Sequence, residues 1–332
     1  MPLETLWFLA VTLLWTGFFV LEGFNFGVGM LAHVVGRDEE ERRAAMATVG
    51  PFWDANEVWL VVAAAAIFAA FPVWYATMFS AFYLALVLLL VALILRGVAF
   101  EFRDRSENPR WRRTWDAVRG IASLLAPFLI GVALANLLAG LPIDGQQEFT
   151  GSLSDLFQPY AVVAGITLVL LCLLHGATFL ALKTDGDLRA RAQRAGDLVA
   201  VPAVVAAIVF AGYAHYEANA GAVPGVLTLG LPGLVIASAV LLRHRRDGWA
   251  FVVTAVAMAT AVLMTFDNLY PRVMVSSTSS ANDLTISNSA SGHYTLVVIT
   301  VIALVFLPLV IGYQSWTYWV FHGRVRGAED AR

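Results

Sequence analysis

A small set of ionisable and amide residues interrupts otherwise apolar segments of this chain, and their chemistry is that of a proton relay. The residues are Glu22, Asn25, Asp54, Glu57, Arg96 and Glu101. Asp54 and Glu57 are three residues apart, so one face of a helix carries both carboxylates. A relay group must gain and lose a proton repeatedly, and a carboxyl group can do so when burial and a nearby guanidinium have opposite effects on its ionisation.

The elements that position these residues are expected to be membrane-spanning helices. The chain has 332 residues, is 59% hydrophobic and only 14% charged, and has a mean hydropathy of +0.74. Soluble domains have about a quarter of their residues charged. Apolar runs of about 20 residues, enough to cross a ~30 Å hydrocarbon core, recur along the chain. We predict an all-α, polytopic membrane protein in which residues 1–332 form a single integral-membrane helical domain. The nine predicted spans lie at about 7–30, 51–72, 76–99, 121–140, 159–182, 198–216, 225–243, 249–268 and 294–320.

Basic residues predict the orientation of these spans. The connections after the first, third, fifth and seventh spans are rich in Arg and Lys, and the tail carries Arg324, Arg326 and Arg332. The connections on the opposite side contain no Lys or Arg except Arg272. The positive-inside rule then places the N-terminus outside and the C-terminus in the cytoplasm. Residues 1–5 have no basic stretch, so we expect the first span to remain as a helix rather than to be a cleaved signal peptide.

A carboxylate near the bilayer centre raises the free energy of helix insertion by about 2.5–3.5 kcal/mol. We therefore expect each such residue to have a partner or a function. Glu22 lies roughly 12 Å deep, about eight residues before the cytoplasmic end of its span. A simpler interpretation exists for Asp54 and Glu57, since acids near a helix N-terminus at the interface are favoured by the helix dipole. A solvated helix end would equally account for Glu101.

Neither a metal site nor a haem site can be assembled from the sequence. Cys172 is the single cysteine, which excludes an internal disulfide and gives no support for a thiolate metal site. His175 is the only histidine in the interior of a predicted span, since His215 lies at the outer edge of 198–216. Low-spin haem ligation calls for two His on facing helices or a His with a Met. We therefore expect this chain to ligate no metal and no haem. No basic patch interleaved with aromatics indicates nucleic acid.

Several ordered sequence blocks resemble subunit II of the cytochrome bd quinol oxidase, and the resemblance covers essentially the whole chain. The blocks include 21–31 (LEGFNFGVGML), 53–59 (WDANEVW), 96–103 (RGVAFEFR), 111–116 (WRRTWD) and 270–274 (YPRVM). The resemblance implies a non-haem subunit of a quinol:oxygen oxidoreductase in the prokaryotic cytoplasmic (inner) membrane. Its heterodimeric partner would be subunit I, which would carry haems b558, b595 and d and catalyse quinol oxidation and the four-electron reduction of O₂ to water.

The resemblance also implies what this chain would contribute. It would supply part of the subunit interface, a site for a structural quinone and a cytoplasmic proton path, with no catalytic residue of its own. Small single-span accessory subunits are compatible with such a complex. By the family motif, Asp54 and Glu101 match acids at the cytoplasmic entrance of the path and Arg96 matches a basic residue lining it. Trp59 matches an aromatic residue near a hydrophobic oxygen path.

Two positions depart from the family pattern. The family often has Asp at the position of Asn25, and an amide cannot carry a proton as an acid does, so the relay there would need water or the nearby Glu22. Some relatives have an uncharged amide at the position of Glu57. Our hypothesis is that the extra acid at Glu57 partly substitutes for the acid missing at Asn25.

Two other functions fit the same residues. An ion-coupled secondary transporter would also use intramembrane acids, but transporters typically have broken helices in matching halves and polar sites at the midplane. Here the acids crowd the cytoplasmic third of the predicted bilayer, and no paired Gly/Pro breaks occur. A purely structural membrane subunit, whose acids only hold helices together, is separated from the relay by substitution of Asp54 and Glu101.

Overall fold

The structure is a computed structural model that describes residues 1–218 and 224–325. Arg326 and Arg332 of the predicted basic tail lie outside the described residues. The described part of the chain forms eleven α-helices, and two short strands lie in a connection near its C-terminal end. Nine of the helices are long and apolar enough to cross a membrane. The prediction of an all-α, polytopic membrane protein is confirmed.

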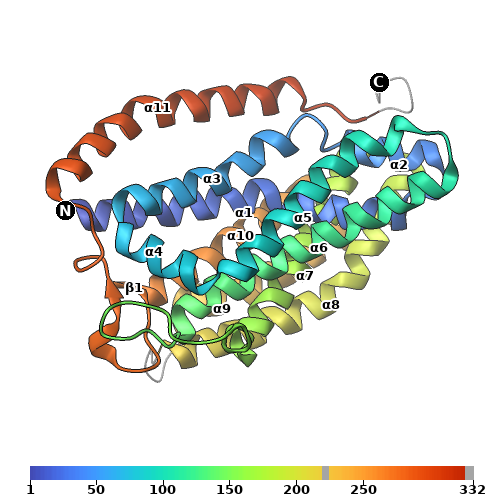
Figure 1. Cartoon of the computed structure of the whole chain (residues 1–332). Helices are drawn as coiled ribbons and strands as arrows, with labels where there is room; N and C mark the ends of the chain where they lie inside the picture. The colour runs from blue at the N-terminus through green and yellow to red at the C-terminus, as the bar shows by residue number, and fades with distance from the viewer. Residues whose placement is uncertain (219–223, 326–332) are drawn as a thin grey trace.

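Most of the helices follow one another with short connections, and the longer ones join α6 to α7 and α10 to α11 (Figure 1). Their bounds are α1 Leu3–Val35, α2 Glu39–Ala47, α3 Trp53–Ala70, α4 Pro72–Ala81, α5 Tyr83–Phe102, α6 Pro109–Ala139, α7 Pro159–Lys183, α8 Gly186–Glu217, α9 Val226–Arg243, α10 Asp247–Leu269 and α11 His293–Val320. The strands are β1 Arg272–Met274 and β2 Leu284–Thr285. All of these helices except the short α2 and α4 are candidate spans.

The predicted third span, 76–99, is wrong at its start. Pro72 begins the separate short helix α4, because its ring fixes φ and removes the N–H that a continuous helix would need. The chain leaves helical geometry again at Phe82, and the spanning helix α5 runs from Tyr83 to Phe102. Helix α2 was not predicted either. Asp38 caps it by accepting a hydrogen bond from the backbone N–H of Glu41 at 2.9 Å.

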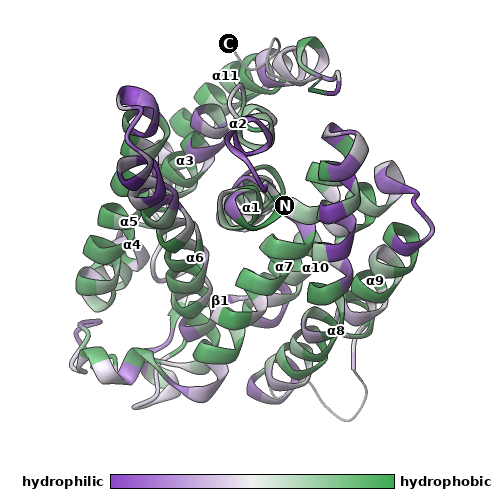
Figure 2. Cartoon of the chain, turned by 90° about the vertical axis from the view of Figure 1, so that its right-hand side faces the viewer, coloured by the Kyte–Doolittle hydropathy of each residue, from purple (hydrophilic) through white to green (hydrophobic). Residues whose placement is uncertain are grey.

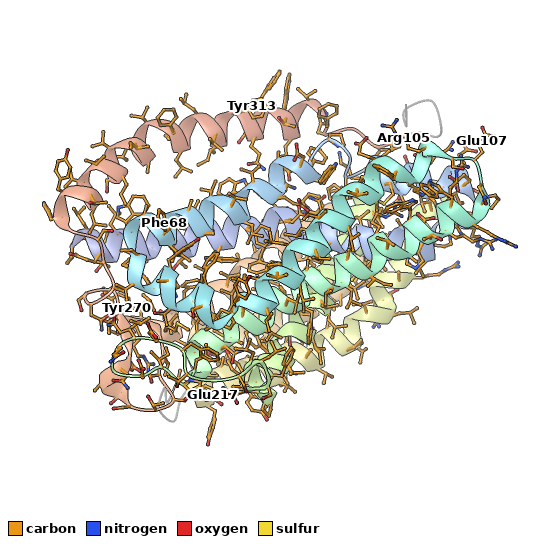
Figure 3. All side chains as sticks on the ribbon, in the orientation of Figure 1. Phe68, Arg105, Glu107, Glu217, Tyr270 and Tyr313 are labelled. Carbon is orange, nitrogen blue, oxygen red and sulfur yellow. The ribbon has the colours of Figure 1, made fainter. Side chains whose placement is uncertain are left out.

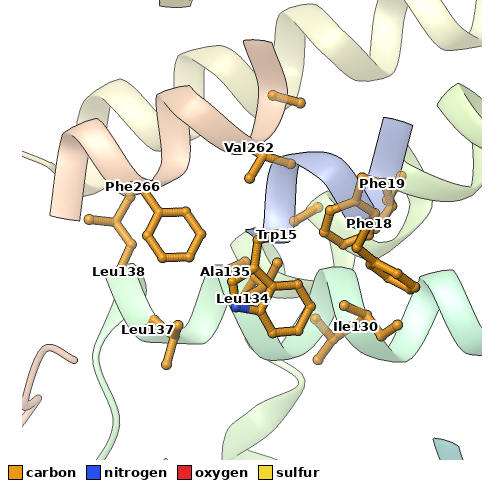
Figure 4. Close-up of a cluster of buried hydrophobic side chains, with 14 of the residues drawn as sticks. Trp15, Phe18, Phe19, Ile130, Leu134, Ala135, Leu137, Leu138, Val262 and Phe266 are labelled. Carbon is orange, nitrogen blue, oxygen red and sulfur yellow. The ribbon is translucent and has the colours of Figure 1, made fainter. Parts of the chain in front are cut away.

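Helix α1 lies in the middle of the bundle, with α3–α6 on one side and α7–α10 on the other (Figure 2). Its N-terminal half is anchored by large aromatic side chains. Trp15, Phe18 and Phe19 are buried among Leu134 of α6, Val262 of α10 and their neighbours (Figure 4). Aromatic rings bury large apolar areas, so this cluster fixes the position of α1 between the two helix groups.

Helix α11 differs from the rest because it lies along the outside of the bundle (Figures 1 and 2). Only Leu296 and Gln314 of its residues are buried. Near its start, Trp7 Nε1 of α1 donates a hydrogen bond to Thr300 Oγ1 at 2.9 Å. The apolar surface of α11 is therefore available to lipid or to another protein chain.

The long connections at one end of the bundle form an ordered cap. Strands β1 and β2 pair antiparallel, and Ser276 Oγ donates to the carbonyl of Ile143 at 2.8 Å. Figure 3 shows Tyr270 and Glu217 at this end, and Arg105 and Glu107 at the opposite end. The start of α1 and the end of α11 also lie at opposite ends (Figure 1). The orientation relative to the cytoplasm stays a prediction.

Candidate functional site

Arg96 is the centre of an ionic cluster inside the bundle, formed by residues of α1, α3 and α5. Its side chain is fully buried, and Nη1 lies 2.5 Å from Oε1 of Glu22, which is also fully buried. The same Nη1 makes an ion pair and hydrogen bond with Oε1 of Glu57, whose side chain is 23% exposed. The sequence could not pair these residues, because each belongs to a different helix. One guanidinium thus serves two carboxyl groups.

Neighbouring side chains complete the surroundings of this cluster. Asn25 Nδ2 donates a hydrogen bond to Glu22 Oε2 at 2.7 Å. The Arg96 guanidinium lies over the ring of Phe26, 4.6 Å from its centroid, an arrangement that stabilises a cation. Within the described residues, Nε and Nη2 of Arg96 and Oδ1 of Asn25 are buried without a hydrogen-bond partner. Buried polar groups usually have a hydrogen-bond partner, and ordered water can supply it inside the bundle.

Asp54 and Glu101 were predicted to lie at the entrance of the path, and the structure places only Asp54 next to the ionic cluster. Both side chains are exposed. Asp54 lines the same cleft as Glu57, one helical turn away on α3. Glu101 lies at the end of α5, and no hydrogen bond or ion pair joins it to the cluster among the described residues. The structure therefore brings together Glu22, Asn25, Glu57 and Arg96, with Asp54 beside them.

A cleft of about 690 Å³ extends from these acids between α3, α4, α5 and α6. Asp54 and Glu57 are its only charged lining residues within the described chain. Its other walls are apolar and include Trp15, Phe79 and Leu86. The cleft can therefore hold a long apolar molecule with a polar group at the acidic end.

Trp59 is part of a hydrogen-bond network that fastens α11 to α3. Its Nε1 donates to Gln314 Oε1 at 2.6 Å, and Gln314 Nε2 donates to Asn56 Oδ1 at 2.7 Å. Asn56 is fully buried and also exchanges hydrogen bonds with the Tyr318 hydroxyl at 2.9 and 3.0 Å. Sequence reasoning missed Gln314 and Tyr318. The signal was available, since a glutamine within an apolar span needs a partner.

His175 is engaged in packing and hydrogen bonding. Nδ1 lies 2.7 Å from Thr254 Oγ1, and Nε2 lies 3.2 Å from the backbone oxygen of Val20. The imidazole also stacks on Phe251 at 4.7 Å. Both ring nitrogens are thus occupied, and this histidine does not fit a haem iron. No group of three or more His, Cys, Asp or Glu side chains among residues 1–218 and 224–325 could hold a metal ion.

A second ionic network fixes helix α2 to the ends of α5 and α6. Arg103 Nε is 2.7 Å from Asp116 Oδ1, and Arg103 Nη1 is 2.8 Å from Glu39 Oε1. Burial opposes ionisation of Glu39, but hydrogen bonds from Arg103 and the charges of Arg103, Arg112 and Arg43 outweigh it and lower the pKa of Glu39. The network holds α2 against the ends of α5 and α6.

Fold and site together define a polytopic helical membrane protein with a buried carboxylate–guanidinium cluster near one face. The family model for cytochrome bd terminal oxidase subunit II matches residues 3–321. The chain belongs to the cytochrome bd terminal oxidase subunit II family, and is thereby a subunit of a quinol-oxidising enzyme complex. This family membership excludes a secondary transporter.

Individual relatives agree with this assignment over nearly the full length. A Bacillus subtilis protein described as cytochrome bd ubiquinol oxidase subunit 2 is 45% identical over 331 residues, covering 98% of both chains. An Escherichia coli protein described as cytochrome bd-I ubiquinol oxidase subunit 2 is 35% identical, covering 97% of this chain and 95% of that one. A chain in the structure of bd oxidase from Geobacillus thermodenitrificans has a TM-score of 0.77 at 18% identity, covering 97% of this chain and 99% of that chain. At that identity the likeness concerns the fold.

Proposed function

We propose that this subunit carries protons from the cytoplasm through α3, α5 and α1 towards a haem-bearing subunit I. The observation that supports this proposal is the contact of one buried guanidinium, Arg96, with both Glu22 and Glu57. Asp54, exposed beside Glu57, would receive protons from cytoplasmic water. Glu101 would add a second surface acid at the same entrance.

The charge of the cluster suits a relay. Two carboxylates and one guanidinium have a net charge of −1, and an uncompensated charge buried in a membrane is costly. One bound proton makes the cluster neutral, and either Glu22 or Glu57 can hold it. The cluster would therefore store one proton and pass it from the half-buried Glu57 to the fully buried Glu22.

The departures at Asn25 and Glu57 are consistent with this route. Asn25 donates to Glu22 and stabilises its carboxylate form without carrying a proton itself. Glu57 contacts Arg96 and borders the cleft that Asp54 also lines. An acid at 57 can thus take over a step that an acid at 25 would perform in other members. For Trp59, a place beside an oxygen path remains a prediction.

Subunit I, the expected partner, would supply the haem groups of the complex. Haems b558, b595 and d would belong to subunit I, since His175 does not fit a haem iron. The buried, unpaired groups of Arg96 and Asn25 suit ordered water within the path. In the prokaryotic cytoplasmic membrane, the heterodimer would oxidise quinol and reduce O₂.

The test replaces the acids within the assembled complex. Asp54→Asn should lower quinol-driven O₂ consumption at least tenfold, about 1.4 kcal/mol on the barrier. Glu57→Gln should slow it as well, and haem content per complex should stay unchanged in both. Glu107→Gln is the matched control, because Glu107 is an exposed acid at the same end of the bundle (Figure 3). Full turnover in the triple variant at 54, 57 and 101 would refute the relay, and loss of assembly would favour the purely structural role.

We also propose that the apolar cleft holds a structural quinone. Its volume and its apolar walls are suited to an isoprenoid chain, and the acidic end to the polar ring. Leu86→Trp would fill the cleft and should reduce the quinone extracted per complex. Leu198→Trp, at a side chain 79% exposed on α8, should not. Equal quinone content in both variants would contradict this site.

A further inference from the structure

A basic pocket lies at the end of the bundle where α7 ends and α10 begins, and it shares no residue with the ionic cluster of Arg96. Its volume is about 390 Å³. It is lined by Leu182, Arg189, Arg245, Arg246, Asp247, Gly248, Trp249 and Arg324. Four of these eight residues are arginines. The proposed proton path uses none of them.

Two of the four arginines are already paired. Arg189 Nε donates to Asp247 Oδ2 at 2.8 Å, and Arg324 Nη1 donates to Asp185 Oδ1 at 2.6 Å. Arg245 and Arg246 are exposed and make no side-chain hydrogen bond or ion pair with any residue that the structure describes. The pocket therefore has two guanidinium groups in excess over its carboxylates. Such an excess is suited to an anion, and guanidinium pairs bind phosphate oxygens especially well.

The turn between α9 and α10 positions these two groups. The N–H of Arg245 donates to the carbonyl of Leu242 at 2.9 Å, and the N–H of Arg246 to that of Leu241 at 3.0 Å. These bonds close the C-terminus of α9 and place the next residues at the start of α10. The first turn of α10 has no side-chain cap, so its N–H groups add positive potential on the same side.

An exposed apolar stripe continues from the pocket along α10. Trp249, Val252 and Val256 lie on one face of this helix, with exposed fractions of 65%, 47% and 46%. Because α10 is a candidate membrane span that begins at Asp247, the stripe is expected to face hydrocarbon and the pocket to lie at the level of the lipid headgroups. Trp249 between them has the position that tryptophan favours at a membrane interface.

We propose that this pocket binds the headgroup of an anionic phospholipid, with an acyl chain along the Trp249–Val252–Val256 stripe of α10. The excess guanidinium groups select for negative charge, and the stripe selects an amphiphile over a soluble phosphate. A basic pocket between helix ends next to apolar surface is a recurring form of lipid recognition.

The test uses the purified complex, stripped of lipid in detergent and titrated with phosphatidylglycerol while native mass spectrometry counts the bound lipids. The variant is Arg245→Gln with Arg246→Gln. The matched control is Arg110→Gln with Arg113→Gln, which removes the same charge from exposed positions of α6. Loss of two guanidinium contacts should weaken binding of one phosphatidylglycerol about thirtyfold. The visible absorption of the complex checks that each variant is assembled.

Two further measurements distinguish a phospholipid headgroup from a soluble phosphate ion as the ligand. Phosphatidylcholine should bind more weakly than phosphatidylglycerol to the wild-type complex, and the two arginine variants should not change its binding. Inorganic phosphate should fail to displace phosphatidylglycerol, because it cannot use the apolar stripe. Equal phosphatidylglycerol binding by the Arg245/Arg246 variant and the wild type would overturn the proposal. Displacement by inorganic phosphate would also overturn it, since the pocket would then be a site for soluble anions.

Discussion

Glu22 and Arg96 form an ion pair in which neither side chain is exposed, with Oε1 and Nη1 2.5 Å apart. A pair so deeply buried is not a source of stability by itself, since removing two charges from water costs about as much as their attraction returns. Loss of Arg96 would leave Glu22 as an uncompensated charge in the membrane, whereas loss of Glu22 would leave Arg96 paired with Glu57.

Arg96→Gln should therefore damage the complex more than it damages turnover per complex. It leaves Glu22 and Glu57 without their counter-charge, and breaking a buried pair in this way costs about 3–5 kcal/mol. Arg96→Gln combined with Glu22→Gln removes both charges of the fully buried pair and leaves only the partly exposed Glu57 unpaired, so it should recover part of the assembled complex. Yield and thermal stability of the purified complex measure the effect. A single variant as stable as the wild type would show that the pair is dispensable.

Gly27 fixes how closely α1 approaches α7, and a methyl group there should separate the two helices. A Cβ at Gly27 would lie 2.0 Å from the backbone oxygen of Cys172 and 2.7 Å from Cα of Gly176. Backbone atoms cannot move aside as a flexible side chain can, so Gly27→Ala should cost at least about 1–3 kcal/mol. Gly230→Ala in α9 is the control, because nothing lies within 4 Å of its Cβ. Comparable thermal stability of the two variants would contradict this account.

The sequence predicted most of the fold because membrane spans are encoded by length and apolarity alone. Every one of the nine candidate spans was found in this way. The break between α4 and α5 at Phe82 was missed, since no proline, glycine or charged residue marks it. Helix α2 was missed because it is short and its position depends on ion pairs such as Glu39 with Arg103.

The sequence predicted which residues form the site, but not the contacts between them. Buried charge is expensive, so Glu22 and Arg96 were conspicuous from their types alone. Their pairing depends on how α1, α3 and α5 pack, which no spacing within one helix reveals. Glu101 was grouped with them through the family motif, yet it is exposed and makes no contact with the cluster among the described residues.

The attachment of α2 should weaken in acid because it depends on the ionised form of Glu39. Burial acts against ionisation, but Arg103, Arg112 and Arg43 lower the pKa of Glu39 below its ordinary value of 4.5. A carboxyl whose pKa is lower in the folded state contributes stability above its unfolded pKa and loses it as pH falls through the folded value. Hydrogen exchange of residues 39–47 should therefore accelerate as pH falls below about 4.5.

Glu39→Gln should remove part of this pH dependence and raise exchange of α2 already at neutral pH. Glu40→Gln serves as its control, since Glu40 is exposed and forms no ion pair among the described residues. If exchange of α2 after correction for intrinsic rates is independent of pH in the wild type, the ion pairs of Glu39 do not hold this helix.

The hydroxyl of Tyr318 should matter for holding α11, while that of Tyr313 should not. Tyr318 shares two hydrogen bonds with Asn56, and its ring stacks on Phe52 at 4.5 Å. Tyr313 is 64% exposed on the same helix and points away from the bundle (Figure 3). Tyr318→Phe keeps the stacking but removes one partner of a buried amide, which costs about 1–3 kcal/mol.

Because α11 has so few other buried contacts, the loss at Tyr318 should appear as release of this helix rather than as unfolding of the bundle. Limited proteolysis of the complex should cut Tyr318→Phe faster within residues 293–320, while Tyr313→Phe is cut at the wild-type rate. Equal rates in the two variants would mean that Gln314, which also donates to Asn56 at 2.7 Å, holds α11 without help from Tyr318.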